Sequence, residues 1–542
     1  MNRNVILLLL CCTIVGGGFL RFYGLEWGIP KAPYWCNHYQ DEAFVLALLL
    51  KMEPSDLNPH YYINPTFHYY SLLFSLKIAS FFKYIKPFSS PIKLNNLGQP
   101  VEDITMDDYS RMYRVGRFLV IIESTLLVFL VFLIGRNLYH EKIGIIAAAF
   151  TAIVPALVYQ SHFLVVDAPG VFWLILALFY LTTQVNSKGL KQWYIISGIL
   201  IGIAIGTKYT NILFILPLFY KIYLLNKEKN TIFIKKIFND KTFITLGIAI
   251  IVFFLTTPHA IFSFREFLYG DAHGFGGIFG RRGLLYYNAY PTNILTPFVL
   301  TTYNSLRLPL TIFAFISLFY LFYRKSISDR FLLFLIVPFY LMMIYHASPH
   351  LRHILPVLPF LMIAQARMFY DLITINRRKF IRIIAIILLT FTFCYTLLFS
   401  LSLVKRMTPI DTRIECTEWI KRRTTKDTVI SLARYFPWNP PLPIEKLPAK
   451  FYVVDYNYRS LLSQKPDYFI MTEYEFRDFS YTPASESTCK DFVRRIFSEE
   501  HFKITKVFRK DFEILGITFS PKYPNMDWNP VNPEVYVLMP KF

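Results

Sequence analysis

The chain has 542 residues, of which 54% are hydrophobic, and its formal net charge at pH 7 is +21. Its apolar residues form blocks long enough to cross about 30 Å of hydrocarbon, which excludes an ordinary soluble enzyme. The positive charge does not indicate a nucleic-acid partner, because Lys and Arg gather in short connections and no nucleic-acid-binding module is visible. We therefore predict a multi-pass α-helical membrane protein.

The apolar blocks predict eleven membrane helices. They lie near residues 4–20, 115–134, 142–160, 169–184, 193–208, 209–224, 242–257, 308–323, 331–346, 354–370 and 382–404. Alternate connections are rich in Lys and Arg, which is typical of short cytoplasmic loops. With Arg3 also inside, we expect a cytoplasmic N-terminus and an extracytoplasmic C-terminus in the inner or plasma membrane. No small-residue cleavage site follows the first block, which favours a retained anchor over a signal peptide.

Two long external loops are expected. The first covers residues 21–114, and its aromatic run at 67–74 predicts a helix lying in the membrane interface. A loop of this length has to fold rather than serve as a mere connector. The second covers residues 258–307.

The last part of the chain, residues 405–542, has no long apolar block. Short runs of β-branched and aromatic residues predict strands at 429–432, 451–454 and 468–471. Residues 411–421 predict a helix capped by Asp411 or Thr412. We therefore predict a transmembrane domain over 1–404, followed by a small external α/β domain.

The most informative polar feature is the acidic pair Asp41-Glu42, just beyond the first helix. Carboxylates at the rim of a membrane protein are costly to hold and seldom incidental. Asp41 is the stronger candidate for a functional carboxylate, with N-capping of a helix over 43–50 as the alternative. Glu42 either shares that role or is a solvated neighbour.

Further polar residues fall on the same external side under this topology. They are His162, Asp167, Lys208, His259, Arg265 and Arg352. Taken singly, each reads as a helix cap or as a side chain that snorkels to the interface. Their convergence on one side, opposite the acidic pair, is what transfer from a lipid-phosphate donor needs. Cations would hold the leaving phosphate while a carboxylate removes the acceptor's proton.

The second external loop contains five glycines within residues 274–283, together with Arg281 and Arg282. Backbone amides and guanidinium groups suit an anion such as a phosphate, so this stretch could be a mobile, basic flap. A plain flexible linker is equally compatible with the sequence.

Neither the histidines nor the cysteines predict a metal centre. Three histidines share a face by their spacing, namely His346, His350 and His353. Pro349 interrupts that helix, so we expect no metal and no cofactor. Cys416 and Cys489 lie outside and could pair in an oxidising compartment, a question the sequence leaves open.

A series of short motifs runs along about residues 1–405. They are Asp41-Glu42, Asp56-Leu57-Asn58-Pro59-His60, Asn64-Pro65-Thr66-Phe67-His68-Tyr69-Tyr70, Arg114-Val115-Gly116-Arg117-Phe118, Gly135-Arg136-Asn137-Leu138-Tyr139, Ser161-His162, Asp167-Ala168-Pro169, Gly206-Thr207-Lys208-Tyr209-Thr210 and Arg352-His353-Ile354-Leu355-Pro356. In these motifs the chain resembles the bacterial relatives of protein O-mannosyltransferases and of lipid A aminoarabinose transferases, which are glycosyltransferases of the GT-C fold akin to glycosyltransferase family 39. Each motif is loose, but their order is specific.

The resemblance implies a polyprenyl-phosphate-linked sugar as donor, inversion at the anomeric carbon and no metal requirement. Carried over by position, Asp41 is the general base, with Glu42 beside it, and Asp167 is a second acidic residue lining the acceptor cavity. His162 and Tyr69 would line that cavity too. The residues expected to contact the donor phosphate are Lys208, His259, Arg265, Arg281, Arg282 and Arg352.

Two departures from the family pattern concern the first loop. Many relatives have His-Pro-Pro or Lys-Pro-Pro where this chain has Asn64-Pro65-Thr66, so one phosphate contact is absent or supplied elsewhere. Gln40 replaces a proline before the acidic pair, which puts the loop geometry in doubt.

Together these features predict an integral membrane glycosyltransferase that acts on the extracytoplasmic face. The enzyme rival is an oligosaccharyltransferase-like or O-antigen-ligase-like membrane transferase; the Trp-Trp-Asp signature of oligosaccharyltransferases is not found. The other rivals are a transporter or flippase of lipid-linked sugars and a non-catalytic GT-C-like polymer-binding protein. Transporters tend to show paired halves, which this chain lacks. The sequence does not tell the sugar, the polyprenol, the oligomeric state, or whether the acceptor is a protein, lipid A or another glycan.

Overall fold

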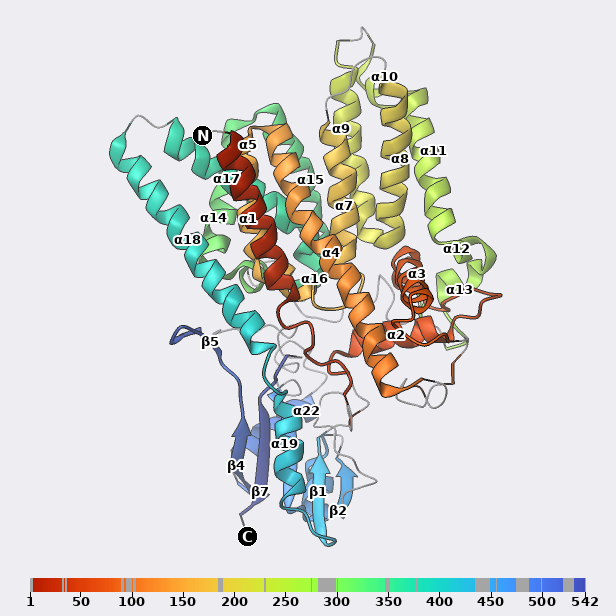
Figure 1. Cartoon of the computed structure of the whole chain (residues 1–542), viewed down its shortest axis with the longest axis vertical. Coiled ribbons are helices and arrows are strands. Elements are labelled where there is room, and N and C mark those ends of the chain that lie inside the picture. Colours follow the sequence, from red (N-terminus) through yellow and green to blue (C-terminus); the bar gives the residue numbers. More distant parts are fainter. Residues whose placement is uncertain are drawn as a thin grey trace.

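The structure is a computed structural model of residues 1–542. It describes the chain apart from residues 1–2, 32–33, 35–36, 89–91, 94–99, 101–103, 184–188, 229–230, 274, 281–298, 300, 347–350, 376–377, 434–448, 455, 474–486, 499, 520–530 and 542. A bundle of helices forms one end of the molecule and a mixed α/β domain forms the other (Figure 1). The N-terminus lies at the end of the bundle far from that domain (Figure 1).

The bundle helices lie where the apolar blocks predict them. They are α1 (Arg3–Phe22), α4 (Met106–Leu138), α5 (Glu141–Ile153), α6 (Pro155–Gln160), α7 (Asp167–Thr182), α8 (Leu190–Thr207), η1 (Tyr209–Phe214), α9 (Ile215–Leu225), α11 (Asp240–Thr256), α14 (Thr302–Arg324), α15 (Ile327–His346), α16 (Leu351–Ile354), η4 (Leu355–Val357), α17 (Leu358–Thr374) and α18 (Lys379–Arg406). Within the described part of the chain, six helical segments are long and apolar enough to cross a membrane by themselves. The chain is a multi-pass membrane protein, and the expected number of eleven spans stays a prediction.

Two helix boundaries differ from the expectation for local reasons. The block at 142–160 is broken between α5 and α6, because Pro155 has no N–H to donate and keeps Val154 out of the helical region. Helix α4 begins at Met106, well before the expected residue 115. Thr105 caps it by accepting a hydrogen bond from the Asp108 N–H. The first external loop therefore ends earlier than expected.

Helices α4, α5, α7 and α17 form the centre of the bundle. Their apolar side chains, such as Val131, Phe150 and Leu361, are almost fully buried in one large cluster. Helices α4 and α5 come very close where a Cβ on Gly144 would lie 2.4 Å from the Phe132 carbonyl oxygen. Only glycine fits there, so this contact fixes the turn between the two helices.

Short helices cover the end of the bundle that faces the α/β domain. Helices α2 (Gln40–Lys51) and α3 (Phe67–Phe81) come from the long segment between α1 and α4. Helices α12 (His259–Phe262) and α13 (Phe264–Tyr269) come from the long segment between α11 and α14. Figure 1 shows all four beside the lower ends of α4, α8 and α11, whereas α10 (Phe233–Ile237) lies at the opposite end. The helix predicted at 67–74 is thus part of α3.

The C-terminal part folds into a mixed α/β unit, as expected. Its elements are α19 (Thr412–Lys421), β1 (Thr428–Leu432), β2 (Ala449–Val453), α20 (Tyr458–Gln464), β3 (Tyr468–Thr472), α22 (Ser487–Phe497), β4 (Phe502–Phe508), β5 (Phe512–Ile514), β6 (Ile517–Phe519) and β7 (Val535–Pro540). The main sheet has the order β2-β1-β3-β7-β4, with β1 parallel to β2 and β3. Asp411 caps α19 by accepting from the Arg413 N–H. Cys416 on that helix is a buried free thiol, and the side chain of Cys489 lies outside the described part of the chain.

Candidate active site

One cavity lies at the end of the bundle next to the α/β domain, with a volume of about 390 Å³. Its polar walls come from segments that are far apart in the sequence: α2, α3, the start of α7, the end of α8, and α16. The described residues that line it are Asp41, Phe44, Val45, Tyr61, Ile63, Asn64, Tyr69, Val165, Val166, Asp167, Lys208, Tyr209, Thr210, Phe275, Met342, Arg352 and His353. Five side chains singled out from the sequence thus share one cavity: Asp41, Tyr69, Asp167, Lys208 and Arg352.

Asp41 stands in the first turn of α2, where a helix N-terminus stabilises a carboxylate. Arg352 Nη1 donates to Asp41 Oδ2 at 2.6 Å across the cavity. The Asp41 side chain is 51% exposed and that of Arg352 is 25% exposed. This pair is therefore open to water and to a ligand that enters the cavity.

Asp167 and Lys208 form a second, nearly buried ion pair. Asp167 begins α7, and Lys208 Nζ lies 2.5 Å from its Oδ1. Helix α8 ends at Thr207, because Lys208 adopts an extended backbone with φ −149°, which turns the chain toward the cavity. Gly170 leaves room for the lysine stem, since a Cβ there would lie 3.2 Å from Lys208 Cβ. Asn211 Nδ2 donates to the Gly170 and Ala204 carbonyls and holds the break in place.

Glu42 faces away from the cavity and is fully buried. Arg117 on α4 donates to both of its carboxylate oxygens, with Nε 2.7 Å from Oε1 and Nη2 2.6 Å from Oε2. Asn37 Nδ2 and the Leu164 N–H donate to the same carboxylate. The adjacent acidic residues therefore differ in environment: Asp41 faces the cavity, and Glu42 ties the start of α2 to α4.

The two remaining residues expected to line the acceptor cavity lie in different surroundings. Tyr69 is buried on α3 and reaches the cavity wall. His162 is buried behind the wall, with Nδ1 2.8 Å from the Val158 carbonyl oxygen and Nε2 2.9 Å from that of Tyr23. Burial lowers the pKa of His162 to about 4, so the ring is neutral at physiological pH.

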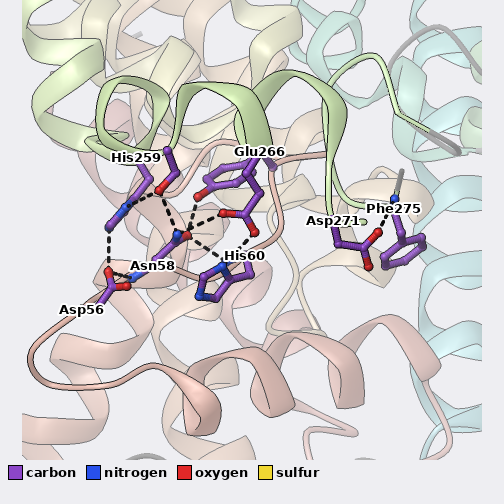
Figure 2. Close-up of polar contacts among 9 residues, drawn as sticks. Asp56, Asn58, His60, His259, Glu266, Asp271 and Phe275 are labelled. Atoms are coloured by element: carbon purple, nitrogen blue, oxygen red, sulfur yellow. Dashed lines mark hydrogen bonds and ion pairs between the residues drawn. The ribbon is translucent and has the colours of Figure 1, made fainter. Parts of the chain in front are cut away.

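The expected phosphate ligands on α12 and α13 lie outside the cavity lining. His259 faces Asp56, with Nε2 3.6 Å from Oδ1, and burial lowers the pKa of its imidazole. Figure 2 shows this pair beside the Glu266 carboxylate, which accepts from Asn58 and contacts His60 Nδ1 at 2.8 Å. These contacts join the first external loop to α12 and α13.

Arg265 stands on α13 and is exposed, away from the cavity-lining residues. The other two expected phosphate ligands, Arg281 and Arg282, lie outside the described residues. A backbone contact fixes the start of the glycine-rich stretch, because the Tyr62 N–H donates to the Gly276 carbonyl at 2.5 Å. Phe275 thereby reaches the cavity wall next to Tyr61, at 5.8 Å between ring centroids.

Sequence reasoning missed several lining residues, notably Tyr61, Phe275 and Met342. None carries a charge or a motif that stands out in an aromatic-rich chain, so no sequence signal separated them from ordinary core residues. Asn64 had such a signal, since the resemblance drawn from the sequence implies a basic residue at its position. It lines the cavity, so the change alters the wall itself. Among the described residues, no group of three or more His, Cys, Asp or Glu is arranged to hold a metal ion.

Both the sequence and the fold of this chain resemble those of known proteins. Residues 111–262 match the family model described as dolichyl-phosphate-mannose-protein mannosyltransferase. No curated protein sequence matches the chain at a significant level. The crystal structure of the Archaeoglobus fulgidus oligosaccharyltransferase tethered with an acceptor peptide aligns at 14% identity with a TM-score of 0.54, over 91% of this chain and 72% of that one. The chain has the GT-C fold.

Other solved structures resemble the chain over almost its whole length. ArnT from Cupriavidus metallidurans in the apo state aligns at 11% identity with a TM-score of 0.49, over 98% of each chain. The same protein bound to undecaprenyl phosphate aligns at 12% identity with a TM-score of 0.44, over 99% of this chain and 98% of that one. The family match and the GT-C fold confirm the resemblance inferred from the sequence.

Proposed function

We propose that this chain is a membrane glycosyltransferase. It transfers a sugar from a polyprenyl-phosphate donor to an acceptor hydroxyl on the extracytoplasmic face, with inversion at the anomeric carbon. The proposal rests on two ion pairs that share one cavity at the end of the bundle, Asp41 with Arg352 and Asp167 with Lys208. The GT-C fold and the family match to a lipid-phosphate-dependent mannosyltransferase support the class of donor.

The cations account for the lipid phosphate. The guanidinium group of Arg352 suits two phosphate oxygens at once, and the Lys208 ammonium adds a compact positive charge. Apolar neighbours such as Val166 and Met342 give the first isoprene units a surface to lie on. Asn64, which stands where relatives have a basic residue, leaves these two cations as the main positive charges among the described lining residues.

The carboxylates account for the transfer step. When a phosphate occupies Arg352, Asp41 loses its partner and becomes available as a base. It then takes the proton of the acceptor hydroxyl, whose oxygen attacks the anomeric carbon from the face opposite the phosphate. The bond from that carbon to the phosphate oxygen breaks, and its electron pair leaves with the polyprenyl phosphate. Lys208 and Arg352 stabilise the charge that develops there.

Asp167 has a supporting part in this scheme. Because its carboxylate contacts Lys208, it fixes the direction of the ammonium group and lines the acceptor side of the cavity. The step needs only side chains of the chain itself.

Binding of polyprenyl phosphate tests the proposal, because that product is common to every sugar and acceptor. Undecaprenyl phosphate is titrated into purified protein in nanodiscs for wild type, Lys208→Gln and Arg352→Gln. Each charge-assisted hydrogen bond contributes about 1.5–3 kcal/mol, so each variant is expected to bind at least about tenfold more weakly. Arg114→Gln is the matched control, since Arg114 lies on α4 and pairs with Glu26 away from the cavity lining. Equal affinity in all four proteins would contradict the proposal.

A further inference from the structure

The C-terminal domain carries a small hairpin that is separate from its main sheet. Among the residues that the structure describes, strands β5 and β6 pair only with each other, with Phe512 opposite Phe519 and Ile514 opposite Ile517. Figure 1 shows the hairpin projecting sideways from the sheet, beside the lower end of α18. The hairpin therefore extends away from the C-terminal sheet and toward the helical bundle.

The hairpin contacts α18 within its apolar stretch. The ring of Phe512 stacks on Phe399 at 5.6 Å, and that of Phe519 lies edge-on to Tyr395 at 5.6 Å. Between Arg382 and Lys405 this helix has no charged residue, a run of about 33 Å at about 1.5 Å per residue. Phe399 and Tyr395 stand about 9 and 15 Å before Lys405 along the helix axis. The hairpin thus contacts α18 inside the uncharged stretch that is long enough to cross a bilayer.

The two faces of the hairpin differ in polarity. Alternate residues of a strand share a face, so Ile514 and Ile517 lie on the same side as the two phenylalanines that contact α18. The opposite face carries Glu513 and Thr518, both exposed. Ile517 is 46% exposed although it lies on the apolar face. This face therefore extends beyond α18 and meets no protein over part of its area.

The turn adds an exposed leucine where the backbone favours other residues. Leu515 has φ +51° and Gly516 has φ +77°, a pair of positive values that favours Asn-Gly or Asp-Gly. Leucine is strained in this region, yet here it stands at the tip and is 81% exposed. On α18, Phe391 is 57% exposed, and its ring lies 6.1 Å from that of Tyr395, which Phe519 of the hairpin contacts.

We propose that the β5–β6 hairpin is a membrane anchor. Its tip, Leu515 with Ile517 and Ile514, inserts at the boundary between lipid headgroups and acyl chains of the leaflet next to the C-terminal domain. Its polar face, with Glu513 and Thr518, stays in the headgroup water. The anchor holds the C-terminal domain against the bilayer, and this role does not depend on the proposed transferase activity.

Fluorescence quenching by brominated phospholipids tests the anchor. Wild type, Leu515→Trp and Thr518→Trp are reconstituted as full chains into vesicles with and without bromine atoms near the upper acyl chain. The emission that each added tryptophan contributes is the difference from wild type. We expect brominated lipids to remove most of the emission added at position 515 and little of that added at position 518, which lies on the opposite face of the same hairpin.

The proposal is overturned if the emission added by Leu515→Trp is unaffected by brominated lipid, or if both positions are quenched alike. Because both positions are exposed, neither substitution disturbs a packed core. A size-exclusion profile equal to that of wild type verifies that the variants are folded. Leu515→Asn supplies a second readout. Asn suits the turn, so a purely structural hairpin would gain thermal stability in vesicles, whereas an anchor would release the C-terminal domain to faster proteolysis.

Discussion

The adjacent carboxylates Asp41 and Glu42 are expected to respond differently to the same chemical change. Glu42→Gln keeps the shape of the side chain but removes a fully buried charge that pairs with Arg117. Breaking a buried pair from one side costs about 3–5 kcal/mol, because the partner charge stays buried without compensation. The new amide group also points a donor at the guanidinium or at Asn37, whose amide donates to the native carboxylate. Out of a total stability of about 5–15 kcal/mol this is a severe loss.

Asp41→Asn is the matched comparison. Its side chain is half exposed, and an exposed ion pair contributes about 0–1 kcal/mol. Thermal unfolding of purified protein in nanodiscs should therefore show a Tm lowered by about 3–4 °C for Glu42→Gln and little change for Asp41→Asn. The double variant Glu42→Gln with Arg117→Gln should cost less than the sum of the single variants, since the two side chains share one interaction.

A Glu42→Gln protein that unfolds at the wild-type temperature would contradict the structural role of the Glu42–Arg117 pair. A stable Glu42→Gln protein that has lost sugar transfer per folded molecule would instead assign the chemistry to Glu42. In that case Asp41 would be the residue that only holds Arg352.

Three further outcomes follow from the site. Asp167→Asn should bind undecaprenyl phosphate roughly tenfold more tightly, because a charge-assisted hydrogen bond of about 1.5 kcal/mol no longer competes for Lys208; weaker binding by the same titration would contradict this. Gly170→Val should weaken donor binding, since its side chain would displace the Lys208 stem from its place beside Asp167; unchanged titration would show that the contact is unimportant. The pKa of His162 is about 4 in the folded protein and about 6.5 in the unfolded chain, so the unfolded chain binds more protons between these pH values. The free energy of unfolding should therefore fall by roughly 3 kcal/mol as the pH is lowered from about 6.5 to about 4. His162→Gln should flatten that part of the curve of Tm against pH, and an unchanged slope would refute the assignment.

Much of the fold was predictable, because hydrophobic blocks and cap residues are local signals. Hydropathy alone did not predict the break at Pro155 or the early start of α4 after Thr105. Both depend on single residues whose effect is decided by hydrogen bonds rather than by apolar content. The apolar stretches at 209–224 and 354–370 likewise begin as short 3-10 or helical turns.

The charged residues of the candidate site were predictable from the sequence. Asp41, Asp167, Lys208 and Arg352 were found because charged residues at the edge of a membrane bundle are unusual. The difference between Asp41 and Glu42 could not be predicted, since consecutive helical residues point in directions about 100° apart and only the fold decides which one faces Arg117. Apolar lining residues carry no comparable signal.

Sugar transfer by Asp41→Asn tests the central claim most directly. Wild type and variant are reconstituted with a panel of polyprenyl-phosphate sugars and with envelope extract as the source of acceptor, and release of polyprenyl phosphate is followed per folded molecule. A general base typically contributes about 10²- to 10⁴-fold, so the variant is expected to lose transfer on that scale while binding undecaprenyl phosphate at least as tightly as wild type. Turnover at the wild-type rate would contradict the account.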